Sequence, residues 1–407
     1  MTPRNEGDLG KPMKVIWITR SDLRHMTNGA NLYSRGLIDG LRSCGVDVEV
    51  YGYCGSEESP VDGSSLHLFP QPHHRRVLSL LSSLQSDAYR LRSADLAEAL
   101  SRDIDAGTDA VVFDYFAMGW ALPTVRRRAA KDSGCPTALV YVSHNHESTV
   151  RRQVAREYRG NPLMKAVLHL DAWKAERLEQ ELVGSADLVT AITGADASLF
   201  KADAPERSVL TLLPAYDGPV DAEWKLAPQT PRRVVMMGSL EWIAKRESLR
   251  RFVEAANDPF RSAGIELVVV GKVDPSFEQS IRSKWSVCRF LGFLEDPTPI
   301  LRDSRIGLMA DELGGGFKLK YLDYIFRGLP VATIRSHAVG LPFSPDDVML
   351  TGETVTELVE SIIESIDDLD RLNAMKSAAF EACTGKFDWA SRGVALRDAI
   401  IQASGRF

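Results

Sequence analysis

The sequence has few cysteines, no long apolar run and only a small excess of one charge. Its five cysteines are scattered and include no C-x-x-C pair, which argues against a disulfide framework or a zinc site and favours reduced thiols, as in the cytoplasm. No apolar stretch is long enough to cross a bilayer, and the polar leader Met1–Lys11 lacks the apolar core of a secretory signal. The net charge of -6 argues against a general nucleic-acid binder.

What the sequence does contain is enough chain for two globular domains. Its 407 residues exceed the size of one ordinary core, and a hydrophobic share of 44% with a charged share of 26% is typical of soluble globular proteins. Short apolar runs alternate with helical patterns, which predicts parallel βαβ units. In the first half we expect strands at Lys14–Arg20, Asp47–Cys54, Ala110–Phe116, Thr137–Ser143, Ala186–Thr193 and Val209–Pro214, with helices at Ala30–Cys44 and over the long stretch Glu147–Val183.

A second series of strands and helices follows a proline-rich segment. That segment, Ala215–Arg233, holds three prolines and no clean periodicity, which is typical of an inter-domain linker. Beyond it we expect strands at Arg233–Ser239, Ile265–Gly271, Cys288–Leu294, Ile306–Asp311 and Leu329–Ile334, with helices at Glu247–Asn257, Lys318–Arg327, Thr354–Ile366 and Trp389–Ser404. The sequence thus predicts an α/β fold of two Rossmann-like domains, residues 1–216 and 217–388, facing across a cleft, with a last helix in 389–407 that packs back on the first domain.

Asn28 and Gly29 stand where the chain turns from the first predicted strand into the first helix. Free backbone N–H groups at a helix start attract anions, and a glycine lets a diphosphate approach the backbone closely. Both are therefore candidate nucleotide-binding residues. The segment is not a G-x-G-x-x-G motif, so an ordinary turn with Asn28 as the helix cap stays open.

The polar cluster His144-Asn145-His146-Glu147 follows a predicted strand directly. Sites of α/β proteins lie at the carboxyl ends of such strands. Three interpretations stay open: a metal site, a polar loop that caps the next helix, and a binding site in which His144 hydrogen-bonds a sugar hydroxyl. In the last, a neutral imidazole both donates and accepts, and Glu147 binds or activates an acceptor hydroxyl.

The strongest pattern in the sequence is Gly314–Pro330, where three glycines precede Lys318 and Lys320. A glycine-rich turn that enters a helix leaves N–H groups free to bind phosphate, and the lysines add positive charge. Asp323 lies on the same predicted helix, where a carboxylate can bind ribose hydroxyls. After the turn Gly238-Ser239, Lys245 is expected to reach the same diphosphate. The alternative is a flexible loop with solvated lysines.

These residues resemble the donor-binding signature of the family 4 glycosyltransferases. In one branch of that family the pattern runs G-x-G-x-K-x-K-x-L-E and then G-x-P-V, and here Gly314–Val331 matches it with Asp323 in the place of the last acid. Further matches are the turn Gly238–Trp242, the turn Phe290–Gly292, the Ser143-His144-Asn145-x-Glu147 segment, and Glu181 followed by Ala186–Val189. The resemblance implies the GT-B fold, a nucleotide-sugar donor, retention of the anomeric configuration and catalysis without a bound metal or other cofactor.

The resemblance also implies roles for individual residues. The first domain would bind the acceptor and the second the nucleotide sugar. Lys245, Lys318 and Lys320 would lie near the diphosphate, Asp323 at the ribose, Gly292 and Phe293 near the base, and His144 at the transferred sugar. The further candidate nucleotide-binding residues are Asn28, Gly29, Ser239, Gly315, Gly316 and Phe317. The family has an E-x7-E motif, and Gly315 takes the place of its first acid here. Glu312 is the nearest substitute, so His144, Glu312 and Lys245 are the candidate catalytic residues.

Clusters of basic residues in the first half of the sequence indicate which kind of acceptor the protein uses and whether it contacts a membrane. They are His73–Arg76, Arg126–Arg128, and Arg151, Arg152, Arg156 and Arg159. Peripheral contact with the inner face of a membrane, for a lipid-linked acceptor, and solvated helix faces with a carbohydrate or small-molecule acceptor both stay open. The expected product is a polysaccharide, glycolipid or other glycoconjugate. A sugar-nucleotide epimerase or phosphorylase of the same fold, or a non-enzymatic bilobed sugar-binding protein, are the alternatives.

Overall fold

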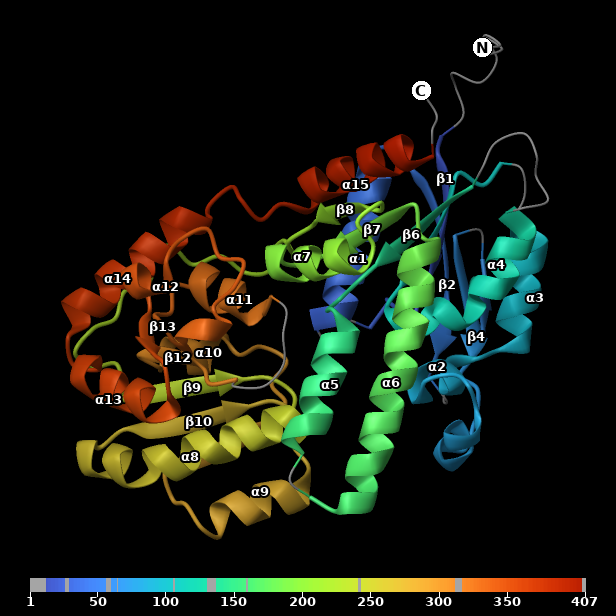
Figure 1. The fold of residues 1–407 in the computed structure, drawn as a ribbon. Helices are drawn as coiled ribbons and strands as arrows, with labels where there is room; N and C mark the ends of the chain where they lie inside the picture. Colours follow the sequence, from blue (N-terminus) through green and yellow to red (C-terminus); the bar gives the residue numbers. More distant parts are fainter. Residues whose placement is uncertain are drawn as a thin grey trace. The chain divides into compact units, whose positions relative to one another are not determined.

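The computed structural model describes residues 12–25, 29–55, 60–63, 65–104, 107–129, 137–158, 160–240, 243–311 and 317–404. The chain forms two compact units, Met1–Ala215 with Asp388–Phe407 and Tyr216–Phe387 (Figure 1). Each boundary falls one residue before the one expected from the sequence. Among the described residues, no helix combines the length and the apolarity needed to cross a bilayer.

The first unit is built on a mainly parallel sheet with β1 near its middle. The strands lie in the order β3-β4-β2-β1-β5-β6-β7-β8, and only the β3–β4 pair is antiparallel. All residues of β5 and β6 are buried, as expected for strands covered on both faces. The strands are β1 (Lys14–Ile18), β2 (Asp47–Cys54), β3 (Val61–Asp62), β4 (Leu66–Pro70), β5 (Ala110–Asp114), β6 (Ala138–Val142), β7 (Leu188–Ala191) and β8 (Ser208–Thr211).

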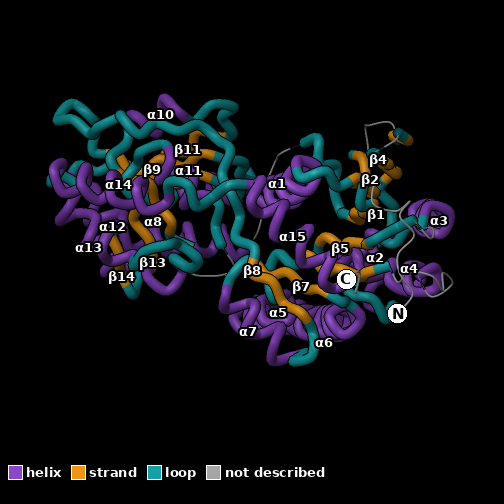
Figure 2. The backbone as a smooth tube through the Cα atoms, turned by 90° about the horizontal axis from the view of Figure 1, so that it is seen from above, coloured by secondary structure: helices purple, strands orange, loops and turns teal. Residues whose placement is uncertain are grey.

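Helices cover both faces of this sheet. Figure 2 shows α1 and α15 on one face and α3, α4 and α6 on the other. The helices are α1 (Gly29–Ser43), η1 (Arg76–Leu81, a 3-10 helix), α2 (Ser86–Leu91), α3 (Ala94–Asp103), η2 (Phe116–Ala121, also 3-10), α4 (Leu122–Ala129), α5 (Glu147–Glu157), α6 (Pro162–Ser185), α7 (Gly194–Asp203) and α15 (Trp389–Ala403).

The last helix, α15, packs tightly against α1 in this unit. A Cβ atom added at Gly40 would lie 2.4 Å from the carbonyl oxygen of Trp389, and one added at Gly393 would lie 2.0 Å from the backbone of Gly40. The indole of Trp389 covers Gly36 in the same way. Glycine at these positions lets the two backbones touch, which explains why the C-terminal helix belongs to the first unit.

The second unit is a six-stranded parallel sheet in the order β11-β10-β9-β12-β13-β14. Its strands are β9 (Arg233–Met237), β10 (Glu266–Val270), β11 (Cys288–Gly292), β12 (Ile306–Met309), β13 (Val331–Ile334) and β14 (Leu350–Gly352). In chain order this is 3-2-1-4-5-6, the doubly wound Rossmann arrangement. The direction of winding reverses between β9 and β12, and ligands of such folds bind at that point.

Helices pack on both faces of the second sheet. Its helices are α8 (Ile243–Ala263), α9 (Pro275–Arg282), α10 (Thr298–Arg302), α11 (Lys320–Phe326), η3 (Arg335–His337, 3-10), α12 (Pro345–Val348), α13 (Val355–Ser365) and α14 (Leu369–Cys383). Buried residues of α8 and α13 share one core cluster with Val234 and Met236 of β9. Alternate strand residues point to the other face, where the Tyr324 hydroxyl of α11 donates to the Val235 carbonyl at 3.2 Å.

Two of the segments that were predicted from the sequence differ in the structure. The stretch Glu147–Val183 is not one helix, because α5 ends at Glu157 and α6 starts at Pro162, with the Asn161 side chain capping it. The proline-rich segment after Ala215 has no helix or strand, as expected, but it is bound to the second unit. Leu226 is buried there, and the Asn373 side chain pairs with both its N–H and its carbonyl.

Candidate active site

Three lysines gather at the reversal point of the second sheet. Lys245 comes from the first turn of α8, which follows β9, while Lys318 and Lys320 follow β12. Burial, together with the positive charges of Lys245 and Lys318, lowers the pKa of Lys320 to about 8. Burial also lowers the pKa of Lys318, whose amino group lies 3.8 Å from the buried Asp311 carboxylate. Like charges held this close mark a site built for an anion.

The backbone of Gly238 lies directly against the Lys320 side chain, and Gly271 packs against Gly238. Gly238 and Gly271 follow β9 and β10 with φ values of +137° and +141°, which residues with a Cβ atom rarely adopt. The Gly238 N–H donates to the Val270 carbonyl at 2.7 Å, and the Gly271 N–H donates to the Gly292 carbonyl at 2.7 Å. A Cβ at Gly238 would lie 1.6 Å from Lys320 Nζ, so the absence of a side chain there makes room for the ammonium group.

Gly238→Ala is therefore expected to cost stability and to displace Lys320. The strained φ should lower the free energy of unfolding by about 1–3 kcal/mol, and the stabilisation that a nucleoside diphosphate gives should shrink because the lysine must move. Gly264→Ala is the matched control, since Gly264 also has a positive φ of +65° but lies away from the lysines. Melting curves with and without nucleotide would measure both effects. If a nucleoside diphosphate raised the melting temperature of Gly238→Ala as much as that of the wild type, Gly238 would not be needed to place Lys320.

Asp323 is already engaged on one side. Its Oδ1 accepts from the Tyr216 hydroxyl at 3.1 Å and from Arg327 Nε at 2.7 Å. The Tyr216 ring stacks on Phe326 at a centroid distance of 4.8 Å, which fixes the hydroxyl. No other described residue bonds Oδ2, so one carboxylate oxygen remains for a ribose hydroxyl.

The other residues expected at the donor are spread along the same edge of the sheet. Gly292 ends β11 with φ +70°, and the Phe293 side chain beside it is 68% exposed. Ser239 follows Gly238 and is half-buried. Phe317 is buried, and the centre of its ring lies 5.9 Å from the centre of the Phe387 ring. Asn28, Glu312, Gly314, Gly315 and Gly316 lie outside the described residues.

The first unit carries a second cluster at its own reversal point, between β1 and β5. A small pocket there is lined by residues after β1, β5 and β6 and at the start of α1: Thr19, Arg20, Ala30, Asn31, Ser34, Asp114, Tyr115 and His144. Gly29 is the first residue of α1, directly before this lining. His144 thus lines a pocket together with Ala30, which directly follows Gly29, and this proximity was not predicted from the sequence.

His144 is held by a buried aspartate that the sequence analysis did not single out. Nε2 of His144 lies 2.7 Å from Asp114 Oδ1, and Asp114 Oδ2 accepts from Trp17 Nε1 at 3.0 Å. Burial alone would raise the pKa of Asp114, but the hydrogen bond and charge of His144 outweigh it and hold that pKa below its usual range. When the imidazole is neutral, the ionised Asp114 keeps the single proton on Nε2, so Nδ1 then presents a lone pair that accepts from a hydroxyl group.

Tyr115, the next residue, adopts a rare backbone conformation beside this pair. Its φ is +81°, the only positive value among the described residues other than glycine. The Arg20 guanidinium lies 4.1 Å from the centre of its ring, and the ring packs edge-on to His144 at 6.0 Å. Such strain persists where the surroundings fix it, most often at functional sites. Arg20 and His144 thus both contact the ring of Tyr115.

Glu147 and His146 are used within the protein. Glu147 Oε2 accepts from Arg151 Nε at 3.0 Å, and Arg151 also bonds the carboxylates of Asp87 and Asp171. His146 lies 3.0 Å from Asp203 and 2.8 Å from the Thr149 hydroxyl. The two histidines thus have separate acid partners rather than a shared one. Glu147 was expected to bind or activate an acceptor hydroxyl, and the structure shows that one of its carboxylate oxygens is bonded to Arg151.

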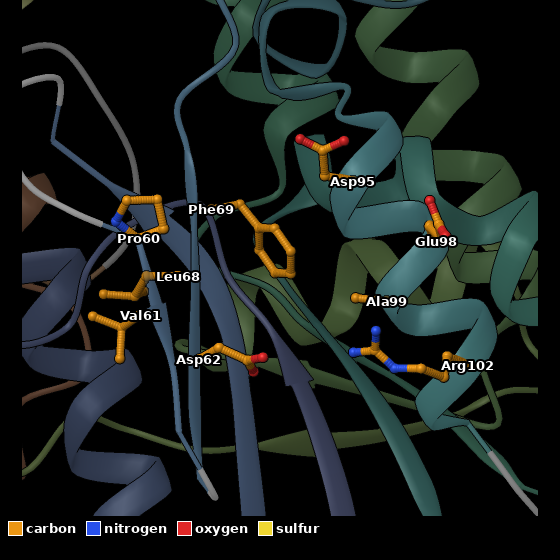
Figure 3. Close-up of a pocket in the computed structure, with 9 residues that line it drawn as sticks. All are labelled: Pro60, Val61, Asp62, Leu68, Phe69, Asp95, Glu98, Ala99 and Arg102. Carbon is orange, nitrogen blue, oxygen red and sulfur yellow. The ribbon is translucent and has the colours of Figure 1, made fainter.

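A larger pocket of about 250 Å3 lies away from both clusters, at the β3–β4 edge of the first unit. Figure 3 shows Phe69 at its centre with Asp62 below and Asp95, Glu98 and Arg102 on the facing helix α3. It is open and mixed in charge, and it contains none of the residues that the sequence proposed. We therefore assign one candidate site to the strand-end cluster of each unit.

Two family models match the chain, one in each unit. Residues 28–215 match the glycosyl transferase 4-like domain, and residues 231–368 match glycosyl transferases group 1. Together they span about four fifths of the sequence. Among curated proteins, nothing matches.

Solved structures of similar fold include three proteins crystallised with or named for UDP. HepE (Alr3699) of Anabaena, solved with UDP and glucose, is 14% identical over 96% of this chain and 100% of its own, with a TM-score of 0.63. A UDP-forming trehalose-phosphate synthase of Burkholderia xenovorans is 13% identical over 97% and 100%, with a TM-score of 0.65. A mutant of S. aureus TarM, solved with fondaparinux, α-GlcNAc-glycerol and UDP, is 12% identical over 75% and 58%, with a TM-score of 0.53. All three share the two-domain GT-B fold with this chain.

Proposed function

Because the chain belongs to the family 4 glycosyltransferases, we propose that it moves a sugar from a nucleotide diphosphate sugar to a hydroxyl acceptor with retention of the anomeric configuration. The observation that carries the proposal is the group of Lys245, Lys318 and Lys320 at the reversal point of the second sheet. The second unit would then bind the donor and the first unit the acceptor.

The lysines would act on the leaving group. As the bond from the anomeric carbon to the diphosphate breaks, its electron pair leaves with the phosphate oxygen and negative charge grows there. Ammonium groups that are already in place stabilise that charge without reorganisation, and electrostatic stabilisation of this kind contributes more to catalysis than any other effect in many enzymes. Since three fixed cations supply this charge, we propose that no metal ion is required.

His144 would act on the sugar. With Nε2 bound to Asp114, its Nδ1 accepts from a sugar hydroxyl and so orients the ring that is transferred. Glu312 stays a candidate for the family's first acid, and Asp323 for the ribose. Arg20 adds a positive charge at the same pocket, which suits an acceptor or donor that carries phosphate.

We further propose an acceptor that is a carbohydrate or is carried on a lipid, and a role in making a polysaccharide, glycolipid or other glycoconjugate. The UDP and sugar ligands of the similar structures support testing UDP-sugars first. We place the reaction in the cytoplasm, with peripheral contact to the inner face of a membrane. The free thiols of Cys44, Cys54, Cys288 and Cys383 support that compartment.

The proposal is tested with a panel of UDP-, GDP- and TDP-sugars, each incubated with the protein and analysed for slow hydrolysis of the donor. One donor should release its nucleoside diphosphate, and that diphosphate should raise the melting temperature. A chelator should change neither result. Lys284→Ala, which changes an exposed lysine just after α9, is the control that should behave like the wild type.

Two results would replace the proposal. Conversion of a donor into its epimer, with no acceptor present, would make the protein an epimerase. Tight binding of free sugar with no shift from any nucleotide would make it a sugar-binding protein.

A further inference from the structure

Exposed aliphatic side chains are concentrated on one short segment of the first unit. In η1, Val77 and Leu81 are 73% and 88% exposed, and Leu78 and Leu80 are 47% and 40% exposed. Helix α6, the long green helix of Figure 1, exposes Leu163, Met164, Leu170 and Trp173. These two elements carry eight of the thirteen large exposed apolar side chains of the described residues, so the exposure is not scattered.

A buried lysine joins η1 to α6, so the exposed apolar residues of the two elements lie on neighbouring segments. Lys174 of α6 is buried, and its Nζ donates to the carbonyls of Ser79 at 2.9 Å and Leu80 at 3.1 Å, which fixes η1 against the helix. Leu170 precedes Lys174 by one turn and Trp173 follows Leu170 by three residues, so both lie on the same side. We define the η1–α6 face as Val77, Leu78, Leu80, Leu81, Leu170 and Trp173.

Positive groups border the η1–α6 face. Arg75 is the exposed cation directly before η1, where the exposed imidazoles of His73 and His74 precede it, and the Arg177 guanidinium lies 5.0 Å from the centre of the Trp173 ring. The acid nearest in sequence, Asp171, is already used, since it accepts from Gln85 and Arg151. An apolar surface with a basic border and an aromatic ring is complementary to the acyl and phosphate layers of an anionic membrane.

Arg151 and Arg152 of α5 do not supply this border. Arg151 bonds three carboxylates and Arg152 pairs with Glu176, so neither presents a free cation. Arg156 is exposed, and Arg159 lies outside the described residues. The proposal therefore rests on η1 and α6 rather than on Arg151 and Arg152.

We propose that the η1–α6 face docks on the surface of an anionic lipid bilayer, with the η1 side chains among the lipid chains and His73, His74 and Arg75 at the phosphates. A second copy of the chain fits less well, because a symmetric pair would set the same cations against each other. The proposal deepens the proposed function, on which it rests, by bringing the first unit to an acceptor held in the membrane.

The test is flotation of the full chain with vesicles of phosphatidylcholine alone or with roughly one third phosphatidylglycerol. The wild type should float with the anionic vesicles only. Leu81→Glu should lower the bound fraction by about tenfold or more, and Arg75→Glu by several-fold. Val220→Glu, which changes an exposed aliphatic of the second unit, and Arg126→Glu on α4 are the matched controls and should float like the wild type.

The nucleotide-induced melting shift, measured on the same samples, separates the two proposals. A normal shift for Leu81→Glu with loss of flotation supports docking, whereas a missing shift in the wild type counts against the donor site and leaves flotation to be judged by itself. Flotation of Leu81→Glu at the wild-type level, or no flotation of the wild type, would overturn the proposal. So would light scattering that shows a wild-type dimer and a Leu81→Glu monomer, since the face would then bind a second copy.

Discussion

Lys320→Met is expected to remove most of the stabilisation that a nucleoside diphosphate gives the protein and to lower donor turnover by about 10²–10³-fold. Burial and the charge of Lys245 lower the pKa of Lys320 to about 8 from an ordinary 10.5, and its amino group lies against the Gly238 backbone. Methionine keeps the length of the side chain and loses the charge. Titration calorimetry or melting shifts with the diphosphate would measure the loss.

The pH dependence of binding gives a sharper form of this prediction. A diphosphate binds the protonated lysine, so affinity should be constant below about pH 8 and fall by about tenfold per pH unit above it. The free energy of unfolding of the unliganded protein should instead increase as the pH rises. Because the folded-state pKa lies below the unfolded one, the protonated lysine opposes folding, and that cost disappears as the pH rises from about 8 to 10.5.

Lys320→Arg is the control for the charge itself. Arginine stays protonated throughout this range, so the variant should bind the diphosphate with little change between pH 8 and 10. A wild-type affinity that does not change over this range, or a Lys320→Met protein with a full nucleotide shift, would remove the lysine group as the donor site.

Asp114→Asn is expected to lower turnover by about a hundredfold while leaving nucleotide binding intact. The ionised carboxylate fixes the proton on His144 Nε2 through a 2.7 Å contact, and an amide can instead donate to that nitrogen. The imidazole would then carry its proton on Nδ1 and turn a donor, rather than an acceptor, toward the pocket. The rise in melting temperature that a nucleoside diphosphate causes reports on the second unit, and it should be the same in Asp114→Asn as in the wild type.

Two measurements distinguish this orienting role from simple packing. Ring ¹⁵N chemical shifts of His144 report which nitrogen is protonated and should change in Asp114→Asn. Trp17→Phe removes the second bond to Asp114 but keeps the carboxylate, so it should reduce turnover far less and leave the ¹⁵N shifts as they are. Equal losses in the two variants would mean that Asp114 only supports the local structure.

The sequence predicted the sheets well because their central strands are continuous apolar runs. The strand Asp47–Cys54 has the expected bounds, and the reversal points follow from the order of such strands. The short strands β3, β4 and β14 were missed, since two to five residues at a sheet edge carry no distinct pattern. The break between α5 and α6 is present in the sequence as Asn161-Pro162, a helix start that the surrounding charge periodicity conceals.

The candidate site was predicted in part. Lys245, Lys318 and Lys320 meet as expected, because strand ends at a reversal point converge. Asp114 was not predicted because it ends an apolar run, AVVFD, and fits the strand pattern, although a polar residue at such an end is the same signal that singles out His144. The partners of Asp323 could not be foreseen, since Tyr216 lies 107 residues away and meets it only through the fold.

The contact between Gly40 and Gly393 has a consequence for synthesis. The surface of α1 that α15 covers stays bare until the ribosome has made the whole of Tyr216–Phe387 and the helix after it. The nascent first unit must therefore wait with this face exposed while the second unit is translated and folds on its own. Completion of the molecule is then a late, post-translational docking step, and a stop codon before Trp389 would damage the half of the protein that was made first.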